Sequence, residues 1–180
     1  QLGGYCYLNN SAIAAQRVLD GGMRRVAVLD VDYHHGNGTQ SIFWKRSDVL
    51  TVSIHADTTS EFPWFAGHAD EIGHLDGTGW NRNIPLQRGS NMSTWTDAFE
   101  TALGTVVDAA VDALVIALGV DTSIDDPRGT FSLHTADFGR VGTRLAGLRL
   151  PSVIVQEGGY ATDTLGRNVA AFIDGFETTR

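Results

Sequence analysis

Short apolar runs alternate along this chain with stretches in which apolar residues recur at helical spacing. The runs have the length and composition of buried β-strands, and they cover residues 26–29, 49–54, 83–86, 113–120 and 152–156. The periodic stretches predict amphipathic helices over residues 11–20, 38–46, 93–110, 135–148 and 164–176. Because strands and helices alternate, we expect an α/β fold with a mainly parallel sheet flanked by helices.

Candidate N-caps precede several of the predicted helices. A polar group at residues 9–11 stands at the start of the first helix, and Ser93 and Thr135 are expected to cap the third and fourth. In the second helix we expect Ile42 and Phe43 to face the core. The long segment 56–81 shows no periodicity, but its aromatic residues argue against disorder. Loops of this length in a compact domain are usually functional.

Length and composition limit the class of protein. A chain of 180 residues, of which 42% are hydrophobic, can form a single domain, and we expect residues 1–180 to be one partial domain because the chain starts at Gln1 instead of Met. The apolar runs are too short to cross a bilayer, and the net charge of −8 disfavours nucleic acid as a partner. Cys6 is the only cysteine, which fits a reducing, cytoplasmic setting.

Ionisable residues follow the first apolar run directly. Asp30, Asp32 and His34 occupy alternate positions, so in an extended chain they would point to the same side. Two carboxylates and an imidazole at the end of a buried strand need a compensating charge, which a divalent cation would supply. A single aspartate after a strand is often only a cap or turn residue. With His35 included, four ionisable groups lie together, and this density favours a metal site.

Later predicted strands also end in polar residues, namely Ser53 and His55, Asp121, and Glu157 and Tyr160. The carboxyl ends of parallel strands lie at one edge of a sheet, where ligands bind. Asp32, His34 and Asp121 together would suit Zn²⁺ and would leave a position for water or substrate. A capping role for Asp121 remains an alternative, and Ser53 and His55 could make only strand-end hydrogen bonds. Tyr160 could donate a hydrogen bond to an oxyanion, or it could belong to an ordinary turn.

Four segments together resemble the motifs of the histone deacetylase family, and within it most closely the bacterial acetylpolyamine amidohydrolase branch. They are residues 3–10, 30–40, 118–122 and 157–160, and the likeness extends in order to about residue 170. The resemblance implies an arginase/deacetylase-like fold and a zinc-dependent amide hydrolase. Its substrates would be acetylated polyamines or other small acetylated amines. Two alternatives stay open, a protein lysine deacetylase of the histone type and a catalytically silent metal-binding fragment.

The resemblance also implies roles for particular residues. Zn²⁺ would be held by Asp32, His34 and Asp121, and Tyr160 would stabilise the tetrahedral oxyanion. The substrate channel would include Gly4, Tyr5, Phe62, Gly158 and Gly159. One potassium ion would be bound by Asp30, Ser53 and the backbone of Asp32 and His34, and a second by the backbone carbonyls of Phe43, Arg46, Val49 and Trp80.

One feature of the family has no counterpart in this sequence. Its members carry a tandem histidine pair just upstream of the Gly-Tyr-Cys stretch, which serves as general base and acid. His34-His35 is not that pair, because His34 is needed on the metal. Asn37 stands where some relatives have an aspartate that orients one of those histidines. We therefore expect an N-terminally incomplete domain. Its partner would be a small acetylated amine, not nucleic acid or membrane, and a homodimer stays open.

Overall fold

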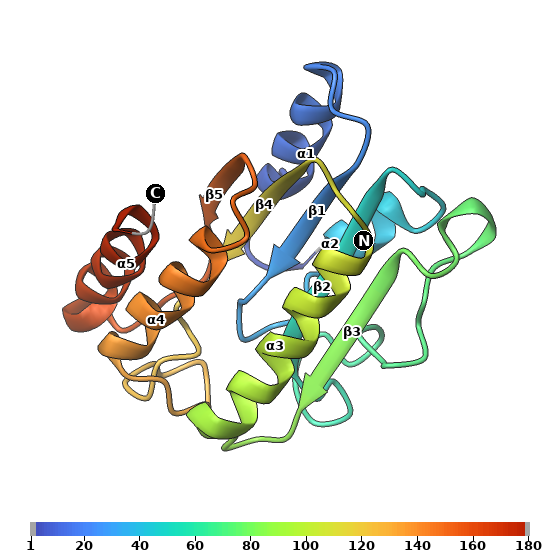
Figure 1. Ribbon diagram of the computed structural model, residues 1–180. Coiled ribbons are helices and arrows are strands. Elements are labelled where there is room, and N and C mark those ends of the chain that lie inside the picture. Colours follow the sequence, from blue (N-terminus) through green and yellow to red (C-terminus); the bar gives the residue numbers. More distant parts are fainter. Residues whose placement is uncertain (1–2, 179–180) are drawn as a thin grey trace.

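Five parallel strands form a single sheet in the computed structural model, which describes residues 3–178 (Figure 1). Residues 1, 2, 179 and 180 lie outside the described part. The strand order is β3-β2-β1-β4-β5, and every neighbouring pair is parallel. The strands are β1 Val26–Asp30, β2 Val49–Ala56, β3 Asn81–Leu86, β4 Ala113–Leu118 and β5 Ser152–Gln156. The predicted α/β fold with a parallel sheet is confirmed.

Helices cover both faces of this sheet (Figure 1). One face packs against α1 (Asn10–Asp20) and α2 (Asn37–Phe43), and the other against α3 (Met92–Asp108), α4 (Thr135–Ala146) and α5 (Thr162–Glu177). Alternate residues of β1 supply the two cores, since Val26 and Val28 join one and Ala27 and Leu29 the other. Every residue of β1, β2 and β4 is buried. β4 is accordingly a continuous apolar run and β1 is one up to its last residue, whereas β2 carries three buried polar residues at alternate positions, namely Thr51, Ser53 and His55.

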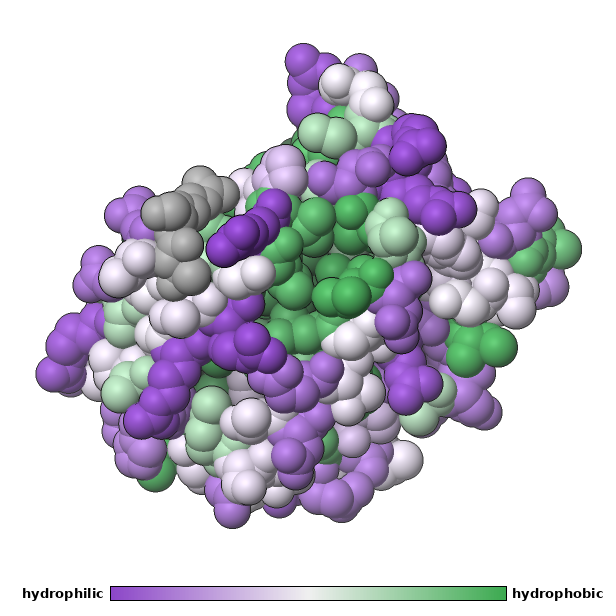
Figure 2. All heavy atoms as spheres, in the orientation of Figure 1, coloured by the Kyte–Doolittle hydropathy of each residue, from purple (hydrophilic) through white to green (hydrophobic). Residues whose placement is uncertain are grey.

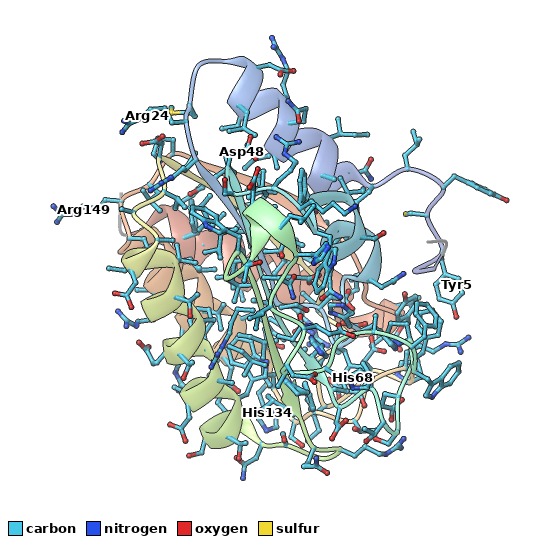
Figure 3. All side chains as sticks on the ribbon, turned by 90° about the vertical axis from the view of Figure 1, so that its right-hand side faces the viewer. Tyr5, Arg24, Asp48, His68, His134 and Arg149 are labelled. Atoms are coloured by element: carbon cyan, nitrogen blue, oxygen red, sulfur yellow. The ribbon has the colours of Figure 1, made fainter. Side chains whose placement is uncertain are left out.

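The register of the strands brings their carboxyl ends to the same level. Asp30, the last residue of β1, pairs with Ser53 of β2 and with Ala117 of β4. In Figure 3, Arg24, Asp48 and Arg149, which precede β1, β2 and β5, lie on one side of the molecule. Tyr5 and His68 lie on the opposite side. Segments that follow β1, β4 and β5 are therefore neighbours, because these three strands are adjacent in the sheet.

Two further features describe the surface. On the face that carries α3, α4 and α5, apolar side chains gather in a hollow near the middle, with polar residues around it (Figure 2). Within residues 3–178, no helix combines the length and the apolar character needed to cross a bilayer.

Four local predictions were wrong, and they concern two helix caps, the burial of one residue and the length of one helix. The N-cap of α3 is Asn91, whose side chain accepts a hydrogen bond from the backbone N–H of Thr94, and not Ser93, which lies inside the helix. The N-cap of α4 is His134 instead of Thr135. Ile42 is exposed although its neighbour Phe43 is buried as expected. α2 covers Asn37–Phe43 and is therefore shorter than the predicted helix over residues 38–46.

The two candidate caps of α3 give a direct stability test. Replacing Asn91 with alanine should lower the free energy of unfolding by about 1 kcal/mol, because the N–H of Thr94 loses its acceptor. Replacing Ser93 with alanine should change it by less than about 0.5 kcal/mol, since the site is an exposed helix position. Urea unfolding followed by circular dichroism measures both. Equal losses in the two variants would contradict the assignment of Asn91 as the cap.

Candidate metal centre

Three ligand-type side chains converge where the chain leaves β1 and β4. Asp32 and His34 follow β1, and Asp121 follows β4. One ligand atom from each of the three lies within 4.8 Å of the others. Nδ1 of His34 is 2.9 Å from Oδ2 of Asp121 and 3.4 Å from Oδ1 of Asp32. A tetrahedral zinc ion with ligand bonds of about 2.0–2.1 Å would separate its ligand atoms by roughly 3.3 Å, so this spacing fits such an ion.

Backbone hydrogen bonds hold the two carboxylates in place. Oδ1 of Asp121 accepts the N–H of Tyr33 at 2.8 Å, and Oδ1 of Asp32 accepts the N–H of His34 at 2.7 Å. Oδ2 of Asp32 accepts the N–H of Gly158 at 2.9 Å, which joins the segment after β5 to the triad. Asp121 is fully buried and its carboxylate bonds to Tyr33 and His34. These contacts favour a ligand role for Asp121 over the capping alternative.

The segment after β5 approaches both carboxylates so closely that it needs glycine. A Cβ atom on Gly158 would lie 2.7 Å from Oδ2 of Asp121 and would overlap Oδ2 of Asp32. Gly159 follows with a positive φ of 148°. Of the predicted pair Gly158-Gly159, Gly158 therefore borders the triad directly, and any side chain at residue 158 would displace the carboxylates.

Asp30 does not point into the triad, contrary to the alternation expected from the sequence. β1 ends at Asp30, so the extended geometry that would align it with Asp32 and His34 stops there. Its buried carboxylate accepts the N–H of Asp32 at 3.0 Å. Asp30 and Ser53 line a small cavity, together with His35, Gln40 and Asn83 among others. The hydroxyl of Ser53 is 2.8 Å from Nδ1 of the fully buried His55.

Burial and close spacing shift the pKa values of the ionisable groups in this cluster. Burial, followed by the charge of Asp32, raises the pKa of Asp121 to about 7 and that of Asp30 well above its ordinary value. Burial alone would lower the pKa of His34, but its hydrogen bonds to Asp121 and Asp32 prevail and raise it to about 10. Carboxylates that resist ionisation and an imidazole that retains a proton both indicate a site suited to a cation. The donor set and its charge therefore fit a divalent metal.

Tyr160 lies at the same edge, after β5. Its side chain is half-buried, and burial, followed by the charges of Asp32 and Asp121, raises the pKa of its phenol to about 12. The ring of Tyr5 meets that of Tyr160 edge to face, with centroids 6.3 Å apart. Phe62 packs close to the N-terminal segment, because a Cβ on Gly3 would lie 3.1 Å from its ring. The N-terminal segment that includes Gly4 therefore contacts Tyr160 through Tyr5 and lies against Phe62 at Gly3.

The residues predicted for a second monovalent cation lie elsewhere. Phe43 ends α2, Val49 starts β2, and Trp80 directly precedes β3, so they surround the amino end of β2 with Arg46. The carbonyl of Phe43 accepts the N–H of Arg46 at 2.9 Å, and that of Trp80 accepts the N–H of Thr51 at 2.9 Å. This group is at the opposite end of the sheet from the triad.

Two buried residues near the site, Asp126 and Asn37, could not be fully assigned from the sequence. Asp126 was not predicted at all, and Asn37 was predicted only by its resemblance to an aspartate position in some relatives. Asp126 is buried, and its carboxylate accepts the N–H groups of both Tyr160 and Ala161. Its sequence context, Asp-Asp-Pro-Arg-Gly, is typical of a simple turn. The one sequence signal that would have indicated a place near the site is its position five residues after Asp121. Asn37 is buried, and within the described part of the chain its Nδ2 has no hydrogen-bond partner.

Comparison with known proteins agrees with this geometry. A model of the histone deacetylase domain matches residues 1–176. The chain is 52% identical over 176 residues to acetylpolyamine amidohydrolase 1 of Pseudomonas aeruginosa, which covers 98% of this chain and 51% of that protein. It is 44% identical over 173 residues to acetylpolyamine amidohydrolase of Mycoplana ramosa, with coverage of 96% and 51%.

A solved structure shows the same fold. The crystal structure of acetylpolyamine aminohydrolase from Burkholderia pseudomallei superimposes with a TM-score of 0.96 at 48% identity, covering 99% of this chain and 52% of that one. The chain therefore spans about half the length of the curated relatives it matches.

Proposed function

The chain belongs to the histone deacetylase family, whose members are metal-dependent enzymes, and from this we propose that the protein containing it is an amide hydrolase. It removes acetyl groups from acetylated polyamines or other small acetylated amines. The observation that carries the proposal is the convergence of Asp32, His34 and Asp121 beside Tyr160, in a chain whose relatives at 44–52% identity are named acetylpolyamine amidohydrolases.

Zn²⁺ is the metal that this donor set suits best, with Asp32, His34 and Asp121 as its ligands. When bound, such an ion supplies Lewis-acid chemistry, since it polarises a carbonyl and makes water nucleophilic near neutral pH. The protein's own contribution is geometric. The backbone N–H groups of Tyr33, His34 and Gly158 orient the two carboxylates before any metal arrives.

Tyr160 acts as the oxyanion donor in this proposal. Because the pKa of its phenol is raised to about 12, the side chain keeps its proton at neutral pH and can donate a hydrogen bond. A donor aimed at the acetamide carbonyl stabilises the negative charge that develops on the oxygen during attack by water. Gly158 and Gly159 border the acetyl group in this proposal, and the absence of a side chain at residue 158 lets this segment lie directly against the two carboxylates.

The leaving amine occupies a channel bordered by Gly4, Tyr5 and Phe62. The contacts between Tyr5 and Tyr160 and between Gly3 and Phe62 support this placement. Aromatic walls suit the alkyl chain of a polyamine, and their faces also attract cationic amines. The net charge of −8 is compatible with a cationic substrate.

Two potassium ions complete the proposed metal set. The first is bound by Asp30, Ser53 and the backbone of Asp32 and His34. Its positive charge would favour the ionised form of Asp30, whose pKa is raised by burial and then by the charge of Asp32. The pairing of Asp30 with Ser53 across β1 and β2 supports this site. The second is bound by the backbone carbonyls of Phe43, Arg46, Val49 and Trp80 around the start of β2.

The general base is proposed to come from residues outside this sequence, since the family's tandem histidines have no counterpart in residues 1–180. The buried Nδ2 of Asn37, without a partner among the described residues, supports a contact there with such a histidine. The 180 residues by themselves would then bind metal but hydrolyse substrate slowly, because general base catalysis typically contributes ~10²–10⁴-fold to the reaction rate.

We further propose that residues 1–180 are part of one deacetylase domain and that the protein is cytoplasmic, without nucleic-acid or membrane partners. The match of the family model over residues 1–176 supports the single domain. The lone cysteine and the acidic composition support the other two points. A homodimer is compatible with the fold, and sedimentation would test it.

Acetate release tests the proposed activity and its substrate class. Zinc-loaded full-length protein should hydrolyse acetylputrescine faster than an acetyl-lysine peptide, by at least about tenfold in kcat/KM, because a channel narrowed by the long 56–81 loop would exclude bulky substrates. The peptide as the better substrate would favour the protein deacetylase alternative. Residues 1–180 alone, loaded with zinc, should be slower than the full-length protein by about 10²-fold or more.

A further inference from the structure

Asp126 connects the loop that carries Asp121 to the segment that carries Tyr160. Its Oδ2 accepts the backbone N–H of Tyr160 at 2.6 Å and that of Ala161 at 3.1 Å. Its Oδ1 accepts the N–H of Arg128 at 2.9 Å, and its own N–H donates to the carbonyl of Ser123 at 3.0 Å. The carboxylate is buried, so water competes little for these three donors.

The segment between β5 and α5 depends on this contact because its other hydrogen bonds to the loops after β1 and β4 are made at Gly158. The N–H of Gly158 donates to Asp32 at 2.9 Å, and its carbonyl accepts the N–H of Val120 at 2.8 Å. Gly159 has no side chain and a backbone conformation that glycine tolerates easily. The next backbone N–H groups held by hydrogen bonds are those of Tyr160 and Ala161, and both bind Asp126.

We propose that Asp126 is a positioning residue that sets the phenol of Tyr160 over the Asp32–His34–Asp121 triad, an inference that rests on the proposed hydrolase function. Asp32 holds one end of the Gly158–Ala161 segment and Asp126 holds the other. The same two loops that supply the metal ligands thus also orient the oxyanion donor. A donor displaced by about 1 Å loses much of its effect on the transition state, about 10²-fold in rate.

Only a carboxylate satisfies the three donors that Asp126 receives. In Asp126→Asn, one carboxamide orientation would place the NH₂ group against the N–H groups of Tyr160 and Ala161, and the other would place it against the N–H of Arg128. The side-chain volume is nearly unchanged. The variant therefore disturbs the hydrogen bonds from Asp126 to the backbone of Tyr160, Ala161 and Arg128 without opening a cavity.

Asp126 also stands at the start of α5, whose N-cap Ala161 has no capping side chain. A merely structural role would follow from that position, because a carboxylate stabilises a helix N-terminus. If the role were only structural, replacing Asp126 would lower stability equally in the wild-type protein and in a protein without the phenol of Tyr160. The dependence of the Asp126 effect on that phenol therefore separates positioning from helix capping.

A double-mutant cycle in the zinc-loaded full-length protein makes this separation, with acetylputrescine as substrate. Asp126→Asn should lower kcat by about 10²-fold, with KM changed less than about threefold and zinc content unchanged. In a Tyr160→Phe background the same substitution should lower kcat by less than about threefold, because the phenol it positions is gone. Asp125→Asn, at the exposed neighbouring position, should leave kcat unchanged.

Hydrogen–deuterium exchange supplies a readout that needs no activity, and its measurement on the wild-type protein is informative by itself. In the wild-type protein, the amides of Tyr160 and Ala161 should exchange slowly, and in Asp126→Asn they should exchange at least about tenfold faster. Fast exchange of both amides in the wild-type protein would overturn the inference even if Asp126→Asn does not fold. A control peptide from β4 should exchange equally slowly in both proteins, because β4 is fully buried.

The remaining outcomes distinguish this inference from the proposed function. Losses that multiply in the double variant, or an unchanged kcat in Asp126→Asn, would overturn the positioning role while leaving an active wild-type hydrolase in place. A wild-type protein that releases no acetate from acetylputrescine or the acetyl-lysine peptide would refute the proposed function, and the positioning role with it.

Discussion

Replacing Asp121 with alanine is expected to remove most of the bound zinc from the full-length protein and, with it, nearly all acetate release. Asp121 supplies one of the three protein ligands proposed, so its loss leaves only Asp32 and His34. Removing a residue that merely supports a ligand typically costs 10–100-fold in metal affinity, and loss of a ligand itself should cost more than about 100-fold. Elemental analysis after dialysis, together with calorimetric titration of Zn²⁺ into the metal-free protein, measures the effect.

The structure suggests a second variant that protects this test from misfolding. Asp121 also accepts the N–H of Tyr33, and alanine would leave that buried donor unpaired. Asp121→Asn keeps an acceptor for Tyr33 but removes the negative charge, so it should fold normally and still bind zinc much more weakly. Asp125→Ala, at an exposed position of the same loop, should bind zinc like the wild type. Full zinc content in both Asp121 variants would remove Asp121 from the ligand set.

The sheet could be predicted from the sequence because its central strands are buried on both faces. β1, β2 and β4 have no exposed residue. β4 and most of β1 therefore appear as apolar runs, and β2 remains recognisable because branched apolar residues separate its buried Thr51 and Ser53. The edge strand β3 was predicted two residues too short, because it begins with Asn81 and includes Asn83, which are both buried. Their amides donate to the side-chain carbonyl of Gln40, a partner about 40 positions away in sequence. No local pattern reveals such pairing.

Helix ends were predicted less well because neighbouring polar residues compete for the cap. Asn91 and Ser93 are both good N-cap residues, and the choice depends on which backbone N–H groups the side chain reaches. His134 caps α4 in place of Thr135, together with Asp137, whose carboxylate accepts the N–H of His134 at 2.8 Å. Since these choices rest on a single turn of backbone, they shift an element by only one or two residues and leave the fold unchanged.

The candidate site could be predicted as far as strand order determines it. Asp32, His34 and Asp121 were expected to meet because the carboxyl ends of parallel strands share an edge, and β1 and β4 are indeed neighbours. The expected alignment of Asp30 with them was wrong, because the strand ends at that residue. Asp126 was missed because its hydrogen-bond partners are backbone N–H groups, which nearly every residue carries and which therefore leave no pattern in the sequence. Its role depends on how two loops meet.

Replacing Tyr160 with phenylalanine should lower kcat for acetylputrescine by about 10²–10³-fold, since a single oxyanion donor typically contributes that much. Zinc content should be unchanged, because the phenol is not among the three ligand side chains. KM should change little, since the hydrogen bond strengthens only as negative charge develops on the carbonyl oxygen. The ring contact with Tyr5 does not need the hydroxyl, so the packing of the channel wall should survive the substitution.

A matched control is available in the same part of the protein. Tyr7 is 98% exposed, so Tyr7→Phe should leave kcat, KM and zinc content unchanged. The contrast with Asp121→Ala is also informative, because that variant should lose metal and activity together, whereas Tyr160→Phe should lose activity alone. Equal turnover by Tyr160→Phe and the wild type would mean that the developing charge is stabilised by groups other than this phenol. In that case the closeness of Tyr160 to Asp32 and Asp121 would reflect packing of the loop after β5 and not a part in the reaction.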